Sequence, residues 1–128
     1  AVSDRRLKKN IDNYSNALEN VMKLSPKLYN FNMQTDGESK YIGLIAQDVI
    51  DLFPSLVTFH KEDDIYMLDY AGFSIVAIRA IQEQQEMIET LNNSNDKLSN
   101  ELELVKQKNI EIENKMNQIL ERLEKLEK

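Results

Sequence analysis

The sequence predicts an α+β fold class: a small head with short helices and β-hairpins, followed by a long C-terminal helix that forms a parallel trimeric coiled coil. Apolar residues recur with a 3-4 spacing from Ile81 to the end of the chain. Neither Pro nor Gly, which interrupt helices, occurs after Gly72. Before that point, short apolar stretches alternate with turn-forming residues, as in small hairpins. The expected domains are a head over residues 1–78 and a coiled-coil trimerisation helix over residues 79–128.

The first half of the head is expected to contain a helix and a hairpin. Apolar residues lie at helical spacing over residues 11–24, and Pro26 follows shortly after. Residues 28–33 alternate apolar and polar side chains, as a half-buried strand does. Asp36-Gly37 is a turn signal, so residues 41–45 are expected to return as a second strand.

The second half of the head repeats this pattern. A short helix is expected over residues 46–53, where it is stopped by Pro54. Residues 56–59 and 65–68 flank a polar stretch and predict a second hairpin. Asp69 is a good N-cap residue, so the long helix is expected to start directly after it.

The long helix carries a repeat that only association can bury. Two heptad positions, a and d, follow one another over seven heptads from Ile81 onward. A surface helix with 3.6 residues per turn would not keep such a narrow stripe on one face, whereas a coiled coil does. The expected core residues of the trimer are Ile88, Leu91, Leu98, Leu102, Val105, Ile112, Met116, Ile119, Leu123 and Leu126.

The number of strands in the coil follows from the types of residue in this seam. β-Branched residues at d beside Leu at a disfavour two strands and favour three or four, of which a trimer is expected. Asn95 and Asn109 lie at a positions and are also compatible with a dimer, which is the alternative. Oppositely charged pairs between g and e positions fit a parallel arrangement and contribute about 0.5 kcal/mol each. These pairs are Glu101 with Lys106, Lys108 with Glu113, and Arg122 with Glu127.

Composition excludes several other classes of protein. Hydrophobic residues make up 41% and charged residues 30% of the chain, which argues against disorder. There is no cysteine and only one histidine, so disulfides and Cys or His zinc sites are excluded, and no cofactor or metal is expected. A net charge of −6 argues against a nucleic-acid partner. No apolar run is long enough to span a bilayer and no signal peptide is evident, so no membrane partner is expected.

The opening residues resemble a known family. Ser3–Ile11, with the sequence SDRRLKKNI, resembles the start of the self-cleaving intramolecular chaperone domain of phage tailspikes, endosialidases and tail fibres. The same domain occurs in the myelin regulatory factor. Further pieces follow in the same order through the chain, and they are Tyr29–Phe31, Gly43–Val49, Phe53-Pro54, Leu68–Tyr70 and Ala80–Glu83.

This resemblance implies a domain at the C-terminus of a fibrous, usually β-helical, homotrimer. Such a domain drives trimer registration and then cuts itself off through a Ser-Lys dyad, as a self-cleaving serine peptidase. At the matching positions the catalytic residues are Ser3 and Lys8, and the cut bond is Ser3–Asp4. The implied folding client is the upstream β-rich fibre of the same polypeptide. The implied place of assembly is a virion precursor in the host cytoplasm, from which the domain is released after cleavage.

The chemistry of a Ser-Lys dyad places demands on its surroundings. Serine is a weak nucleophile until a base takes its proton. Lysine can act as that base only if its pKa falls from about 10.4 toward about 7–8, through burial or nearby positive charge. Ser3 and Lys8 are five residues apart and would share a face on neither a helix nor a strand. Either the chain turns between them or the dyad forms between subunits, and both cases make activity depend on assembly. Positive charge close by in sequence comes from Arg5, Arg6 and Lys9.

Three questions stay open at this level. The first is the bond that is cut: Ser3 could attack the Val2 carbonyl through a five-membered ring, whereas a cut after Ser3 needs another nucleophile, such as water or a neighbouring chain's serine. The second is which residues support the site, for which Arg6 and Gln47 are the candidates. The third is the function class. The alternatives to a self-cleaving chaperone are a non-catalytic trimerisation or receptor-binding tip that is retained, with Ser3 as a simple cap, and a cellular coiled-coil adaptor.

Overall fold

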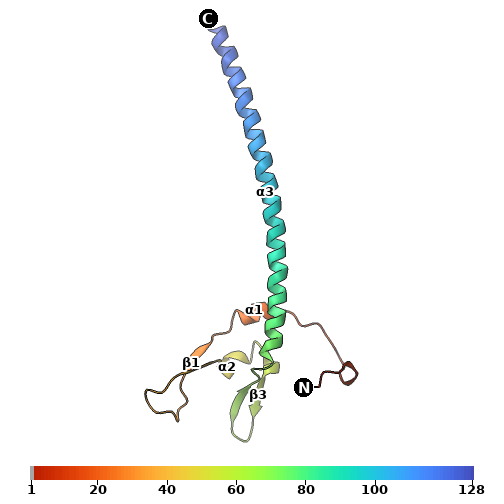
Figure 1. Cartoon of the computed structure of the whole chain (residues 1–128), viewed down its shortest axis with the longest axis vertical. Coiled ribbons are helices and arrows are strands. Elements are labelled where there is room, and N and C mark those ends of the chain that lie inside the picture. The colour runs from red at the N-terminus through yellow and green to blue at the C-terminus, as the bar shows by residue number, and fades with distance from the viewer. Residues whose placement is uncertain (1) are drawn as a thin grey trace. The chain divides into compact units, whose positions relative to one another are not determined.

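The computed structural model describes residues 2–128 and is an α+β structure with two small hairpins and a long C-terminal helix. Figure 1 labels its main elements in chain order. Internal contacts divide the chain into an N-terminal unit, which ends at residue 85, and a C-terminal unit, residues 86–128. The elements are η1 (Arg5–Leu7), α1 (Ala17–Val21), β1 (Lys27–Tyr29), β2 (Tyr41–Gly43), α2 (Ala46–Val49), η2 (Pro54–Leu56), β3 (Val57–His60), β4 (Ile65–Leu68) and α3 (Phe73–Leu126).

The helix α1 is much shorter than the sequence predicts. It covers Ala17–Val21, so the prediction of a helix over residues 11–24 is wrong for residues 11–16 and 22–24. Asn16 adopts a left-handed conformation with φ of 61°, which a helix cannot continue through. Its side chain makes no capping hydrogen bond either. The chain before α1, residues 2–16, is therefore an arm with η1 as its one regular element among the described residues.

The first hairpin pairs β1 with β2 in an antiparallel register that joins Tyr29 to Tyr41. The predicted strand over residues 28–33 ends early because the loop has its own hydrogen bonds. The Phe31 N–H donates to the Gln34 side chain at 2.6 Å, and the Thr35 N–H donates to the Glu38 carboxylate at 3.0 Å. Such side-chain acceptors compete with a strand ladder for the same backbone groups.

The second hairpin confirms the sequence prediction to within one residue. β3 and β4 are antiparallel, with Val57 opposite Leu68 and His60 opposite Ile65. The polar loop between them contains Asp64 with φ of 56°, a conformation that Asp tolerates better than most residues.

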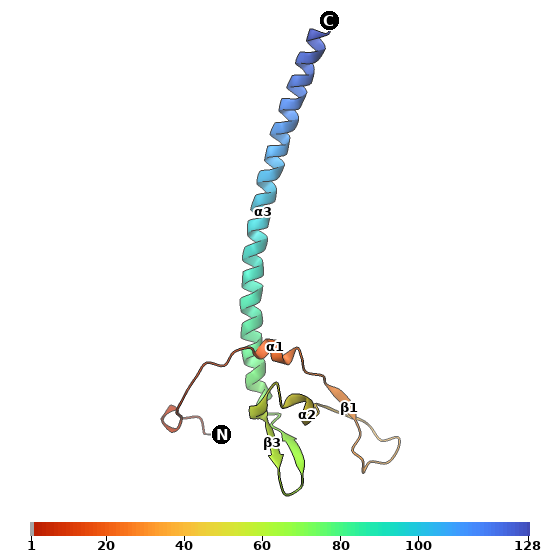
Figure 2. The same ribbon diagram turned by 180° about the vertical axis from the view of Figure 1, so that it is seen from behind.

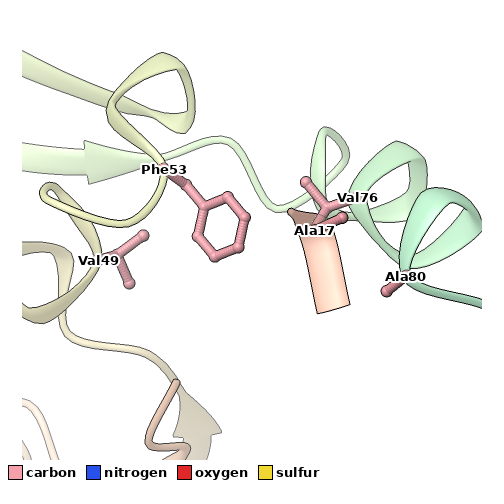
Figure 3. Close-up of a cluster of buried hydrophobic side chains, with 5 residues drawn as sticks. All are labelled: Ala17, Val49, Phe53, Val76 and Ala80. Carbon is pink, nitrogen blue, oxygen red and sulfur yellow. The ribbon is translucent and has the colours of Figure 1, made fainter. Parts of the chain in front are cut away.

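A small apolar cluster holds the N-terminal unit together. Its buried members come from α1, from α2 and the residues after it, and from the first turns of α3, as Figure 3 shows. Phe53 packs edge-on against Phe73, with ring centroids 5.6 Å apart. Both ribbon views place α1 beside the first turns of α3 (Figures 1 and 2). The buried residues are Ala17, Val49, Phe53, Val76 and Ala80.

The helix α3 runs over Phe73–Leu126, a length of 54 residues. It begins three residues later than predicted, because the Asp69 side chain accepts the Gly72 N–H at 3.0 Å and caps a turn that precedes the helix. Within residues 2–128, no helix is both apolar enough and long enough to cross a membrane.

Candidate functional site

Ser3 and Lys8 lie next to each other in the single chain. The Lys8 ammonium Nζ donates a hydrogen bond to the Ser3 Oγ at 2.8 Å. Both side chains are exposed. A nucleophile and a base within hydrogen-bond reach is the arrangement that nucleophilic catalysis by serine requires.

One turn of 3-10 helix brings these two residues together. In η1 the Leu7 N–H donates to the Asp4 carbonyl and the Lys8 N–H donates to the Arg5 carbonyl, both at 3.1 Å. Lys8 itself has extended dihedral angles, so its side chain leaves the turn at the turn's end. The chain therefore turns between Ser3 and Lys8, and the two side chains meet within one molecule.

An ion pair between Asp4 and Arg6 stabilises this turn. The Asp4 Oδ1 accepts the Arg6 backbone N–H at 2.8 Å and the Arg6 Nε at 3.1 Å. The Asp4 Oδ2 accepts the Arg6 Nη2 at 2.6 Å, which makes a two-pronged ion pair. Hydrogen bonds from the Arg6 side chain, and then from its backbone, lower the pKa of Asp4. The same ion pair raises the pKa of Arg6.

Of the two residues proposed as site support, Arg6 lies in the turn beside Ser3 and Lys8, and Gln47 lies elsewhere. Gln47 is in α2, where it lines a cavity of about 330 Å³ together with aromatic rings such as Tyr29 and Tyr70. Over residues 2–128, no group of three or more His, Cys, Asp or Glu side chains is arranged to hold a metal ion.

Glu83 links the start of α1 to α3, a contact that no local sequence pattern predicts. Its carboxylate accepts the Leu18 N–H at 2.8 Å and the Ala17 N–H at 3.3 Å, and so caps α1 in place of Asn16. Arg79 donates to the same carboxylate from one turn earlier at 3.1 Å, and the Glu83 side chain is only 16% exposed. The hydrogen bond from Leu18 is the main cause that lowers the pKa of Glu83. Only the Arg79–Glu83 spacing of four residues was visible in the sequence.

The C-terminal unit carries the predicted coil residues. All of residues 86–128 are exposed in the single chain. The a and d side chains are among them, with Leu91 at 61% exposure and Ile112 at 61%. An isolated helix gains little from such a stripe, because most helix stability in proteins comes from packing of the apolar face.

Comparison with known proteins gives a family match for the N-terminal segment. Residues 3–58 match the family model Peptidase_S74, which is described as chaperone of endosialidase. The match confirms the predicted family resemblance and supports a chaperone role and a peptidase type. It includes the arm from Ser3 onward and the first hairpin, while the pieces at 68–70 and 80–83 lie beyond it. No curated protein matches the chain.

Proposed function

From the premise that residues 3–58 belong to the chaperone-of-endosialidase family, we propose that the chain is an intramolecular chaperone that trimerises and then releases itself by cutting beside Ser3. The observation that carries the peptidase part of the proposal is the contact of 2.8 Å between Lys8 Nζ and Ser3 Oγ. Its client is the β-rich fibre that precedes it in the same polypeptide, within a virion precursor in the host cytoplasm.

Trimerisation is proposed from the exposed seam of the C-terminal unit. Residues 86–126 belong to one helix and none of them is buried, and the apolar side chains recur every three and four residues. Three parallel copies would bury the a and d positions against one another, and the β-branched residues at d favour three strands over two. Because the strands are parallel and in register, trimerisation also sets the register of the chains that precede them.

The cutting step follows from the dyad. Lys8 takes the proton of the Ser3 hydroxyl, and the Ser3 Oγ attacks a carbonyl carbon. For a cut at Val2–Ser3, Oγ bonds to the Val2 carbonyl carbon, the C–N bond breaks, the Ser3 amine takes the proton, and water then hydrolyses the ester. For a cut at Ser3–Asp4, which the family favours, water or the serine of a neighbouring chain attacks the Ser3 carbonyl carbon. The C–N bond to Asp4 then breaks and the Asp4 amine takes the proton, and an ester formed with a serine is hydrolysed by water.

Assembly is proposed to switch this chemistry on. A lysine amine takes a proton only in its neutral form, which removal from water favours. Ser3 and Lys8 are exposed in the single chain. Coverage of the arm in the trimer would exclude water from both side chains, so that only assembled molecules are cut.

The experiment that tests this function starts from the full-length protein with its upstream region. We expect wild-type protein to separate into two fragments, whose masses from mass spectrometry identify the cut bond. Ser3→Ala and Lys8→Ala should each remove self-cleavage and leave the trimer intact. Lys40→Ala is the control, because Lys40 is an exposed lysine outside the arm, and it should cut normally.

Other results would contradict the proposal. Wild-type protein that stays intact as a trimer would favour a non-catalytic tip that is retained. Cleavage that persists in Ser3→Ala would show that the Ser3–Lys8 dyad does not carry out the cut. Mixed trimers of Ser3→Ala and Lys8→Ala chains distinguish a dyad within one chain from one shared between chains, because only a shared dyad can restore cutting there.

A further inference from the structure

The geometry of the Ser3–Lys8 pair depends on contacts within a few residues. The hydrogen bonds that shape η1 and its flanks join residues two to five positions apart. The turn contains two backbone hydrogen bonds and three residues of 3-10 helix. So short a turn is unstable by itself, because the cost of ordering the chain exceeds the gain from its first hydrogen bonds.

The Asp4 carboxylate stabilises the turn with additional hydrogen bonds. It satisfies the Arg6 backbone N–H, which has no partner within the turn, in the way that an N-cap residue does. Its second function is to hold the Arg6 guanidinium, with contacts at 3.1 Å to Oδ1 and 2.6 Å to Oδ2. One carboxylate therefore fixes both the backbone and the side chain of the residue at the centre of the turn.

We propose that Asp4 is a positioning residue, whose carboxylate holds η1 through Arg6 and so places the Lys8 amine on the Ser3 hydroxyl. The proposal deepens the proposed peptidase function and rests on it for its effect on cutting. The positioning itself is a property of residues 3–8. Arg6 is thereby given a definite role, which is to clamp the carboxylate rather than to contact Ser3.

Asp4 has a competing role, because it also flanks the Ser3–Asp4 bond. A residue that merely follows the cut bond would affect cutting whatever stands at position 6. A residue that positions the dyad through Arg6 would lose its effect once Arg6 is gone. The two roles are therefore separated by the coupling between substitutions at Asp4 and Arg6.

The first test measures position without any chemistry. The chain has no cysteine, so Ser3→Cys with Lys8→Cys offers two sites per chain for nitroxide spin labels, measured in trimers that contain one labelled chain and two unlabelled ones. These substitutions remove both partners of the Lys8–Ser3 hydrogen bond, and the turn alone is left to hold the labels together. We expect a short and narrow distance distribution by electron paramagnetic resonance, which becomes longer and broader when Asp4→Ala is added.

A matched control keeps this test specific. Asp12 is an exposed aspartate on the same arm, and Asp12→Ala should leave the label distances unchanged. Distances that are the same with Asp4 and with Ala at position 4 would overturn the proposal.

The second test measures the rate of self-cleavage in full-length protein. Asp4→Ala should slow cutting by about tenfold to a hundredfold, since small misplacements of reacting groups have effects of that size. Asp4→Asn should be slowed less, because its amide oxygen still accepts the Arg6 N–H. Arg6→Ala should also be slow, and the double variant Asp4→Ala/Arg6→Ala should be no slower than the slower single variant. Independent, multiplying effects would assign Asp4 to the flank of the cut bond and overturn its positioning role.

Failure of the two proposals can be told apart. Wild-type protein that never cuts itself would end the peptidase function, and the spin-label distances would still decide whether Asp4 places position 8 against position 3. If wild-type protein and Asp4→Ala cut at the same rate, the peptidase function would stand and the positioning role of Asp4 would be wrong.

Discussion

Glu83 ties together two segments of the N-terminal unit that are 65 residues apart in the chain. It lies on α3, yet its carboxylate accepts the first N–H groups of α1. A carboxylate at a helix N-terminus satisfies unpaired donors and interacts well with the helix dipole. The arm that carries Ser3 leads into α1, and the Glu83 carboxylate fixes the start of α1 on α3.

Replacing Glu83 should weaken the N-terminal unit in a pH-dependent way. Because the pKa of Glu83 is lowered in the folded chain, its stabilisation is fully present above the ordinary value of about 4.3 and is lost as the pH falls below it. We expect Glu83→Gln to lower the melting temperature at neutral pH, and Glu83→Ala to lower it further. At about pH 3, melting of Glu83→Gln should approach that of the wild type.

Circular dichroism melts at the two pH values check this expectation. Glu62→Ala is the control, because Glu62 is an exposed glutamate at the tip of the second hairpin. A difference between wild type and Glu83→Gln that stays constant down to pH 3 would mean that the charge on Glu83 is not what stabilises the unit.

At the scale of the element, the short helices and hairpins depend on a core of only five buried residues, as far as residues 2–128 show. Phe53 is the largest of them and is 3% exposed. Phe53→Ala should destabilise the unit by about 3–5 kcal/mol, a loss typical of buried phenylalanine. Chemical denaturation at fixed protein concentration measures the change, since assembly links stability to concentration.

Met33→Ala is the matched control for this core substitution. Met33 is 92% exposed in the loop of the first hairpin, so its loss should change the free energy of unfolding by no more than about 0.5 kcal/mol. Similar effects at positions 33 and 53 would show that the apolar cluster is not the core of the folded unit.

The elements also show where sequence patterns stop being informative. The second hairpin and α3 were predicted because turn residues and a long apolar repeat are local signals. The start of α1 was missed because its cap, Glu83, comes from another element. The length of β1 was missed because Gln34 and Glu38 take backbone donors in the loop. The sequence predicts that Ser3 and Lys8 act together, but it does not predict the Asp4–Arg6 ion pair that shapes the turn between them.

For the whole molecule, two leucines on α3 test whether the seam drives assembly. Leu102 lies at an a position and is 55% exposed, and Leu104 lies two residues later, outside the seam, and is 57% exposed. Leu102→Asp should disrupt the trimer and with it self-cleavage, because a charge would be buried in the coil core. Leu104→Asp should do neither.

Light scattering gives the mass of each variant in solution. A wild-type mass of three chains supports the trimer, whereas two chains would support the dimeric alternative. Equal behaviour of the two aspartate variants would contradict an interface built on the a and d positions.

The turn at Ser3 has a consequence for the range of proteins that such a domain can serve. Its hydrogen bonds lie inside residues 3–8, so six consecutive residues build the contact between hydroxyl and amine, while cutting itself still depends on assembly. A segment of this kind is portable: joined to an unrelated upstream polypeptide, it would bring its own nucleophile, amine and clamp already arranged.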